Sequence, residues 1–488
     1  MTAEEGVASG HAVASDGAVA SGQVVASGGA VASGQVVASG GAVASGQVVA
    51  SGGAVASGQV VASDGAVISG QVVASGDAVT AGHAVAAGGA VAAGRVVIVG
   101  ASVGGSRLAA GLREAGHTGE VVLVDPDPDA PYDRPPLSKQ ILAGDWDAGR
   151  ASLGDPAQWG AERRVAAATH LDTTDRVLRL DDGTRLGYDR LVLACGAAPR
   201  PLPGMPRGGV HVLRTLADCH GLRADLDRVG RLVVVGGGFI GAEVASTARA
   251  RGIEVTVVEA LPAPLSGLLG EDVAAELALL HTDNGVRLLT GTSVASLVGE
   301  PSVTGVALTD GGVLPADAVV VGIGVRPNTG WLAGSGVALH ADGGVLCDAY
   351  GAAVADRTVY AVGDVARWHD PLLDRHVRVE HWTNAVEQAD AVARSIAGPE
   401  PAPFRHAFFV WSDQYGGKIT LLGRPDPDDE VTVVRAGGER RRFAVAYRRG
   451  ARLAAVLTVN WPKALVVARR SLSAHADADD VVAAWRHL

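Results

Sequence analysis

The chain of 488 residues contains only three cysteines, Cys195, Cys219 and Cys347. They stand far apart, so the sequence has no Cys-x-x-Cys zinc pair, no iron–sulfur ligand run and no disulfide framework. The histidines show no metal-ligand spacing either. We therefore expect no metal site in this chain.

Long hydrophobic runs and a basic N-terminus are also missing. Apolar stretches are interrupted well before the roughly 18 residues that a membrane span needs, and the first residues, Met-Thr-Ala-Glu-Glu, lack the basic segment of a signal peptide. The formal net charge is −11, and residues 1–94 contain no Lys or Arg. This balance argues against nucleic-acid binding. We expect a cytoplasmic protein that binds neither a membrane nor a nucleic acid.

Residues 1–94 consist mainly of a low-complexity repeat of six residues, with Val at every sixth position from Val13 to Val91. An even period would place these valines on one face of an extended chain, and a β-solenoid could stack them into a core. However, Gly and Ser in every unit raise the cost of ordering, and no aromatic residue offsets it. We favour an irregular extension over a solenoid, and expect the chemistry to lie elsewhere.

Two glycine-rich segments follow short valine-rich runs and open helix-like stretches: Gly100-Ala-Ser-Val-Gly-Gly105 and Gly236-Gly-Gly-Phe-Ile-Gly241. A Rossmann unit has this order of elements: a strand, a glycine-rich turn, a helix and a second strand. At such a helix N-terminus, bare backbone N–H groups can meet a pyrophosphate directly. The first copy has Ser102 where the second glycine is expected, so by itself it fits an ordinary strand–turn–helix equally well.

Acidic residues follow each glycine segment at the tip of the next strand. In the first unit Asp125, or Asp127 just beyond it, can accept hydrogen bonds from an adenosine ribose. In the second unit Glu259 can hold both ribose hydroxyls and repel a 2′-phosphate, which predicts a preference for NADH over NADPH. A third strand ends in Gly363-Asp364, where Asp364 could hold a flavin's ribityl hydroxyl or simply cap a helix. We expect FAD and NADH as cofactors.

Seven further signatures occur in an order that resembles the FAD-dependent ferredoxin reductases of bacterial oxygenase systems. They span the chain from about residue 95 to its end: Pro131-Tyr-Asp-Arg-Pro-Pro-Leu-Ser-Lys139, Leu191-Val-Leu-Ala-Cys-Gly196, Leu213-Arg-Thr-Leu216, Gly238-Phe-Ile-Gly-Ala-Glu243, Gly322-Ile-Gly-Val-Arg-Pro-Asn328, Glu380-His-Trp-Thr-Asn384 and Trp411-Ser-Asp-Gln-Tyr415. Two departures are Cys195, where the family usually has Thr, and Pro126, which leaves the ribose contact open between Asp125 and Asp127.

The resemblance implies a set of cofactor-binding residues. Those for FAD are Gly100, Ser102, Gly104 (at the closest approach), Gly105, Asp125 or Asp127, Arg134, Lys139, Ala168 on the adenine side, Arg214, Asp364 and Trp382. Those for NADH are Gly236, Gly238, Gly241, Glu259 and Gly324. Trp382 is expected beside the isoalloxazine, although a purely core role is the alternative.

Lys139 and Glu243 are the expected catalytic pair, because the resemblance places a glutamate next to a flavin-side lysine. Hydride transfer from nicotinamide to flavin leaves a negative charge on the reduced flavin, and a nearby ammonium would stabilise it. The alternative is an ordinary surface salt bridge.

We expect an α/β fold with two Rossmann-like dinucleotide-binding domains in a glutathione-reductase-like architecture. Short alternating strands from about Pro399, followed by a helix, indicate a C-terminal α+β domain. The expected divisions are the repeat (1–94), the FAD-binding domain in two parts (95–204 and 328–397), the NAD-binding domain (205–327) and the C-terminal domain (398–488).

The expected function is the transfer of electrons from NADH, through FAD, to a ferredoxin-type iron–sulfur protein that serves a monooxygenase or dioxygenase. A disulfide reductase of the same fold needs a Cys-x-x-x-x-Cys pair beside the flavin, and no cysteine precedes Cys195. The non-enzymatic alternative is a binding or scaffold protein like the apoptosis-inducing flavoproteins.

An arginine cluster at 440–452 could steer an acidic ferredoxin toward the flavin, or the arginines could simply be solvent-exposed residues on the faces of hairpins. The sequence leaves the oligomeric state open.

Overall fold

The computed structural model forms two compact units, Met1–Ala92 and Ala93–Leu488. It describes the strands of the repeat in the first unit, and in the second unit residues 94–206, 208–371, 373–398, 402–405, 408–439, 441–473 and 476–488. Among these residues there is no helix whose length and hydropathy would let it cross a membrane.

The described residues of the repeat form parallel strands that alternate along the chain between two sheets. The strands are β1 (Thr2–Ala3), β2 (Val7–Ala14), β3 (Val19–Ser27), β4 (Val31–Ala38), β5 (Val43–Ser51), β6 (Val55–Ala62), β7 (Val67–Ser75) and β8 (Val79–His83). From β2 onward the paired residues are 24 positions apart, as in Val31 with Val55 and Gly46 with Gly70. For these residues the preference for an irregular extension is therefore wrong. Ladder hydrogen bonds between identical units offset the ordering cost.

A nine-stranded sheet lies at the centre of one half of the second unit, in the order β11-β10-β9-β15-β28-β27-β26-β29-β30. Its strands are β9 (Val96–Val99), β10 (Val121–Asp125), β11 (Ala161–Val165), β15 (Arg190–Leu193), β26 (Val345–Cys347), β27 (Ala352–Ala353), β28 (Asp356–Ala361), β29 (Ala366–Asp370) and β30 (Arg375–Arg378). The strands from β11 to β28 in this order are parallel. The continuous runs of buried Val, Leu and Ile in β9, β10 and β15 are typical of strands that are covered on both faces of a sheet.

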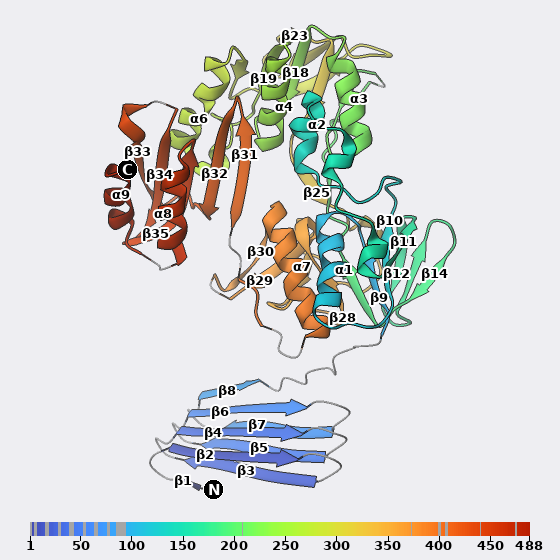
Figure 1. The fold of residues 1–488 in the computed structure, drawn as a ribbon, viewed down its shortest axis with the longest axis vertical. Coiled ribbons are helices and arrows are strands. Elements are labelled where there is room, and N and C mark those ends of the chain that lie inside the picture. Colours follow the sequence, from blue (N-terminus) through green and yellow to red (C-terminus); the bar gives the residue numbers. More distant parts are fainter. Residues whose placement is uncertain are drawn as a thin grey trace. The chain divides into compact units, whose positions relative to one another are not determined.

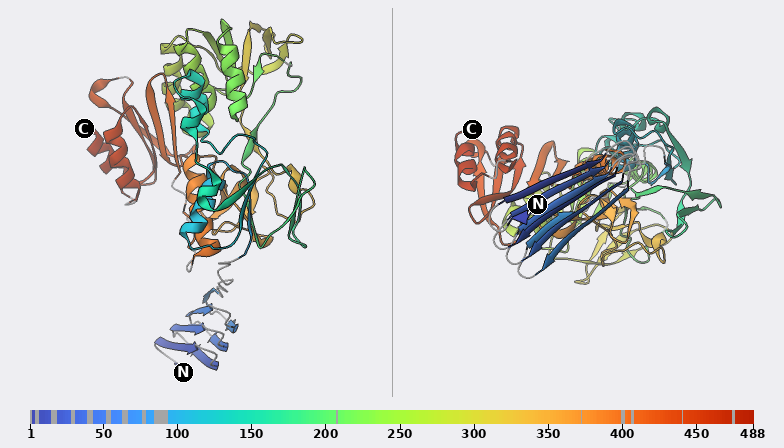
Figure 2. Two further views of the ribbon diagram at one scale, coloured as in Figure 1. Left: turned by 45° about the vertical axis from the view of Figure 1, so that its right-hand side comes forward. Right: turned by 90° about the horizontal axis from the view of Figure 1, so that it is seen from below.

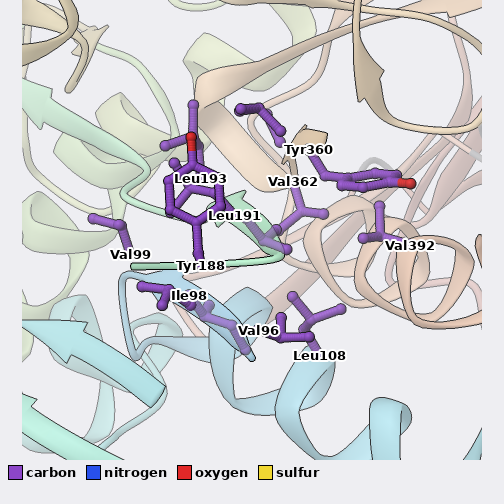
Figure 3. Close-up of a cluster of buried hydrophobic side chains, with 14 of the residues drawn as sticks. Val96, Ile98, Val99, Leu108, Tyr188, Leu191, Leu193, Tyr360, Val362 and Val392 are labelled. Atoms are coloured by element: carbon purple, nitrogen blue, oxygen red, sulfur yellow. The ribbon is translucent and has the colours of Figure 1, made fainter. Parts of the chain in front are cut away.

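Two helices from distant parts of the sequence, α1 (Val103–Glu114) and α7 (Trp382–Ala397), lie side by side against this sheet (Figure 1). Their close approach needs a small residue, because a Cβ on Gly111 would lie 3.1 Å from the Cβ of Ala393. Figure 3 shows the core beneath them, where Val96, Leu108 and Val392 come from these different elements. One hydrophobic core therefore joins two segments that are separated by the whole of the next domain.

A second parallel sheet, in the order β17-β24-β18-β19-β20, forms the other half. Its strands are β17 (Val210–His211), β18 (Arg231–Val235), β19 (Glu254–Val258), β20 (Arg287–Leu289) and β24 (Ala318–Val321). The helices in this part of the chain are α3 (Leu216–Leu226), α4 (Phe239–Ala250), α5 (Ser266–Leu269) and α6 (Glu271–Asp283).

Smaller elements complete these two halves. They are the short helix α2 (Gln140–Ala143), the antiparallel sheets β12 (Ala168–Asp172), β13 (Val177–Leu180), β14 (Arg185–Gly187) and β21 (Val294–Val298), β22 (Gly305–Leu308), β23 (Val313–Pro315), and the pair β16 (Ala197–Pro199) with β25 (Val325–Pro327).

The C-terminal part is an antiparallel sheet in the order β31-β32-β35-β34-β33 with two helices. The elements are β31 (Phe409–Gln414), β32 (Gly417–Gly423), β33 (Glu430–Arg435), β34 (Phe443–Arg449), β35 (Arg452–Val459), α8 (Pro462–Ser473) and α9 (Ala478–Arg486). Alternate residues face opposite sides: Ala444 and Val456 pack with the two helices, whereas Val445 and Leu457 pack against α5 and α6. Figure 2 shows α8 and α9 together on one face.

The edge strand β31 contacts both α4 and α7, so the C-terminal part touches both Rossmann-like halves. The predicted fold class is confirmed, whereas the residue boundaries of the domains stay predictions.

Candidate functional site

The first glycine-rich loop joins β9 to α1, and two of its glycines cannot be replaced without moving backbone. Gly100 has φ +111°, and a Cβ there would lie 2.3 Å from the carbonyl oxygen of Ala194. A Cβ on Gly105 would lie 1.8 Å from the carbonyl oxygen of Gly100. Gly104 is less constrained, because its Cβ would lie 3.5 Å from Val362. Gly100 and Gly105 therefore hold the N-terminus of α1 close to the sheet, as a pyrophosphate site requires.

A partly buried arginine lies beside this loop without a carboxylate partner. Arg134 donates from Nε to the Ser102 hydroxyl at 3.2 Å and from Nη1 to the Arg214 carbonyl oxygen at 2.5 Å. Burial, and after it the nearby charge of Arg214, lowers the pKa of Arg134. Arg214 itself is paired with Asp364 at 3.0 Å, but no described residue forms an ion pair with Arg134. An unpaired guanidinium next to a helix N-terminus fits a bound pyrophosphate.

Three carboxylates, those of Asp125, Asp127 and Asp129, line a hollow next to this arginine. Asp125 accepts hydrogen bonds from the backbone N–H of Ala101 at 2.6 Å and of Asp127 at 2.9 Å, while Asp127 accepts from the Tyr132 hydroxyl at 2.6 Å. The hollow is lined by Ala101, Ser102, Asp125, Asp127, Asp129, Pro131, Tyr132, Arg134 and Arg163. Both predicted ribose ligands thus line the same hollow, beside the first loop and Arg134. Ala168, predicted on the adenine side, begins β12 and does not line this hollow.

Two further predicted residues, Asp364 and Trp382, lie in the turn after β28 and at the start of α7. Gly363 has φ +72°, and its N–H donates to Gln388 at 2.8 Å. Trp382, at the start of α7, donates from Nε1 to Asp133 at 2.8 Å, and its ring centroid lies 5.9 Å from that of Trp411.

His381, immediately before Trp382, was not among the predicted ligands. Its Nδ1 is buried with no hydrogen-bond partner among the described residues, and burial lowers the pKa of His381 to about 4. The imidazole is therefore neutral at pH 7. A buried polar atom without a partner fits a site that a polar ligand completes.

Lys139 and Glu243 form an ion pair, with Lys139 Nζ 2.8 Å from Glu243 Oε2. Their side chains are only 12% and 5% exposed, so this is not a surface salt bridge. Lys139 follows a 3-10 turn over Pro135–Ser138, and Glu243 lies in the first turns of α4. The turn and α2 pack with α3 and α4 in the core of the second half, so the pair attaches this earlier segment of the chain to α4 through a buried contact.

Two serines on the same carboxylate were missed by the residue-level predictions. The Ser138 hydroxyl donates to Glu243 Oε2 at 2.5 Å, and the Ser412 hydroxyl donates to Oε1 at 2.6 Å. Both lie inside recognised sequence signatures, but nothing in their local pattern relates them to Glu243. Ser412 comes from β31, so the C-terminal part also reaches this site.

The second glycine-rich loop, between β18 and α4, repeats the construction of the first. A Cβ on Gly236 would lie 2.4 Å from the Gly322 carbonyl oxygen, and a Cβ on Gly241 would lie 2.1 Å from that of Gly236. By contrast, a Cβ on Gly238 or on Gly324 would meet nothing within 4 Å. These two positions leave space beside the loop, which suits the approach of a nucleotide. Glu259, at the tip of β19, accepts the backbone N–H of Gly237 at 2.7 Å.

None of the three cysteines is set up as a reactive thiol. Burial raises the pKa of Cys195 to about 12 and that of Cys219 to about 11, and it also raises the pKa of Cys347. All three are free thiols. Because a disulfide reductase uses a thiolate, these side chains do not support that chemistry. Among the described residues, no three His, Cys, Asp or Glu side chains are grouped to hold a metal ion.

The arginine cluster of the C-terminal part is largely paired within the chain. Arg449 pairs with Asp429, Arg441 with Asp283, and Arg448 with Glu430. This pairing favours the interpretation of these arginines as solvated hairpin residues over that of a free basic patch.

Family models match most of the second unit. The model of the pyridine nucleotide-disulphide oxidoreductases matches residues 94–389, and that of the reductase C-terminal domain matches residues 409–486. The chain belongs to the pyridine nucleotide-disulphide oxidoreductase family. Ferredoxin–NAD reductases are among its relatives at 38% identity, which confirms the resemblance seen in the sequence.

Two similar proteins serve characterised electron-transfer systems. The ferredoxin–NAD(+) reductase component of the anthranilate 1,2-dioxygenase system of Burkholderia cepacia is 38% identical over 380 residues, 76% of this chain and 92% of that protein. Putidaredoxin reductase of Pseudomonas putida is 38% identical over 368 residues, 73% of this chain and 86% of that protein. Since these relatives are reductases, the alternative of a nucleotide-binding scaffold protein is not favoured.

Solved structures agree with this assignment. The ferredoxin reductase for the CYP199A2 system of Rhodopseudomonas palustris superposes with a TM-score of 0.75 at 32% identity, covering 79% of this chain and 96% of that one. The reductase of a covalent putidaredoxin reductase–putidaredoxin complex gives 0.73 at 33% identity, covering 80% and 99%.

Proposed function

We propose that this chain is an FAD-dependent reductase that passes electrons from NADH to a ferredoxin-type iron–sulfur protein, which in turn serves a monooxygenase or dioxygenase. The observation that carries the proposal is the buried Lys139–Glu243 pair, which holds an ammonium group on α4, the helix that follows the second glycine loop. The relatives support the choice of partner, since one is a component of a dioxygenase system and another is a putidaredoxin reductase. A cytoplasmic location is part of this proposal, because NADH is supplied there.

The residues at the first loop fit FAD. The N-terminus of α1 and the unpaired guanidinium of Arg134 would hold the pyrophosphate, and Asp125 or Asp127 the ribose. Asp364, kept in place by Arg214 at 3.0 Å, would hold a ribityl hydroxyl. When bound, FAD accepts two electrons from NADH and releases them one at a time.

Lys139 is the positively charged member of the buried pair. We assign it the role of stabilising the negative charge that develops on the flavin. Its ammonium is held by Glu243 at 2.8 Å and by the Pro135 carbonyl oxygen at 3.1 Å. Glu243 thereby keeps the ammonium in one orientation. Both groups are nearly excluded from water, which strengthens their electrostatic effect.

The second loop fits NADH. The N-terminus of α4 would bind the pyrophosphate beside Gly238, where the structure leaves space, and Glu259 would hold the ribose hydroxyls. The carboxylate would also repel the 2′-phosphate of NADPH.

A two-stage experiment tests this function. The purified flavoprotein is titrated anaerobically with NADH, and a reduced sample is then mixed with a plant-type or bacterial [2Fe–2S] ferredoxin while the absorbance of both centres is followed. We expect bleaching of the flavin by NADH and then reduction of the ferredoxin. Flavin that is reduced by NADH but transfers no electrons to any ferredoxin tested would instead support the scaffold alternative.

A further inference from the structure

The carboxylate of Glu243 is the point at which three parts of the second unit meet. Glu243 is 4% exposed and accepts hydrogen bonds from three side chains. Lys139 and Ser138 come from the turn before α2 and both donate to Oε2, at 2.8 and 2.5 Å. Ser412 comes from the C-terminal sheet and donates to Oε1 at 2.6 Å.

The two carboxylate oxygens of Glu243 accept different numbers of side-chain hydrogen bonds, two at Oε2 and one at Oε1. The single donor to Oε1, Ser412, is therefore hard to replace. Oε2 keeps one donor if either of its two partners is lost, whereas Ser412 is the side-chain donor that the structure gives to Oε1. A buried carboxylate oxygen without a donor carries its full desolvation cost. Without the Ser412 hydroxyl, the carboxylate would turn to share the remaining donors and would loosen its contact with Lys139.

Ser412 is itself held so that its one proton points at Glu243. The serine is completely buried, and its oxygen accepts a hydrogen bond from Nε2 of Gln414 at 3.0 Å. An amide N–H can only donate, so the hydroxyl proton of Ser412 is left to be given to the carboxylate. The direction of this short chain is therefore defined, from Gln414 to Ser412 to Glu243.

The strand that carries Ser412 is fixed to both halves of the molecule. The backbone N–H of Tyr415 donates to the Ser246 hydroxyl on α4 at 2.7 Å, and Thr383 on α7 donates to the Phe409 carbonyl oxygen at 2.7 Å. Because residues alternate along β31, Trp411 and Ser412 leave on opposite sides, and Trp411 meets Trp382 while Ser412 meets Glu243.

We propose that Ser412, supported by Gln414, is a positioning residue by which the C-terminal domain keeps Glu243 directed at Lys139. The inference rests on the function proposed above for the Lys139–Glu243 pair. It assigns to the C-terminal domain a part in the reduction of the flavin by NADH, in addition to any part in partner binding.

The test uses the fact that Lys139 is one of only three lysines in the chain, with Lys418 and Lys463. Trace acetylation of the FAD-loaded protein, quantified by mass spectrometry, reports how free the Lys139 ammonium is, with the two other lysines as internal references. Stopped-flow reduction by NADH gives the limiting rate and the dissociation constant for NADH separately. We compare S412A with S138A, which removes a hydroxyl from the oxygen that keeps another donor. The matched control is S246A, which removes a hydrogen bond between α4 and β31 without touching Glu243.

In S412A we expect acetylation of Lys139 to rise at least about 3-fold relative to the other lysines, from the loss of a hydrogen bond to a charged group. The limiting rate of flavin reduction should fall about 10-fold, less than for a direct electrostatic contact, with little change in the dissociation constant for NADH. S138A should show a smaller change of the same sign, and S246A neither change.

E243Q separates failure of this inference from failure of the proposed function. If E243Q raises Lys139 acetylation and slows reduction while S412A behaves like S246A, the positioning role of Ser412 is wrong and the proposed function stands. If NADH reduces the flavin of E243Q at the wild-type rate, the role proposed for the ion pair itself is wrong. Equal effects of S412A and S246A on both measurements would mean that the strand has only a structural role.

Discussion

The carboxylate of Glu259 accepts a hydrogen bond from the backbone N–H of Gly237 at 2.7 Å, which ties the tip of β19 to the glycine loop before α4. Its other oxygen accepts the N–H of Leu261 at 2.8 Å. The first half has the same arrangement, since the carboxylate of Asp125 accepts a hydrogen bond from the backbone N–H of Ala101 at 2.6 Å. In each half an acidic residue thus holds the loop and at the same time puts a negative charge beside it.

This charge leads to a prediction about coenzyme choice. Wild-type kcat/KM should favour NADH, and Glu259→Ala should narrow the preference by roughly 10-fold, because repulsion of the 2′-phosphate is removed. No Arg or Lys occurs at 260–265 to attract that phosphate. Glu259→Gln is the control for the loop contact. It removes the negative charge but keeps a side-chain oxygen that can accept the hydrogen bond from the Gly237 N–H. A wild-type preference for NADPH would show that the assignment of this site is wrong.

A second prediction concerns FAD retention. Arg134→Met should weaken FAD binding by about 10- to 100-fold, the scale of one charge-assisted hydrogen bond to a phosphate. Isothermal titration of the apoprotein with FAD measures the change. Arg357→Met is the control, because Arg357 is 78% exposed and pairs with Asp348, away from the hollow. Equal FAD affinity in wild type and Arg134→Met would remove Arg134 from the pyrophosphate site.

A third prediction tests the ion pair. Lys139→Met should fold and keep much of its FAD but reduce it with NADH roughly 10²-fold more slowly, the usual scale of one electrostatic contact. Glu243→Gln should act by loosening the lysine, so the double mutant should be non-additive in single-turnover reduction. Fully additive effects would mean that the two residues act independently, and a Lys139→Met protein reduced at wild-type speed would place the lysine outside the chemistry.

The fourth prediction is that the protein without residues 1–94 stays yellow and oxidises NADH. The two glycine loops both follow Arg95, and the backbone N–H of Arg95 is held by Asp189 at 2.7 Å within the second unit. Flavin absorbance and the melting temperature of the truncated protein are compared with those of the full chain. Loss of flavin on truncation would show that the repeat supports the reductase fold.

Local patterns made both dinucleotide loops predictable. Gly105 and Gly241 are needed because a Cβ there would meet the carbonyl oxygen of the glycine five residues earlier, and this requirement follows from the strand–turn–helix geometry alone. Lys139, Glu243 and Arg134 were found because they lie in segments that resemble those of the reductases. In the repeat, by contrast, the prediction from composition was wrong. Units 24 residues apart pair through ladder hydrogen bonds, and the stability that this pairing adds cannot be read from the content of Gly and Ser.

What the sequence by itself determined is therefore the two nucleotide-binding units, their acidic strand tips, and the absence of a cysteine pair. Only the tertiary structure decided which donors surround Glu243, because Ser138 and Ser412 approach it from segments far away in the chain. It also paired Arg441 with Asp283, which no local pattern connects. The physical reason is the same in each case: a turn or a helix start is governed by neighbouring residues, whereas a buried charge is satisfied by whatever the packed domains bring to it.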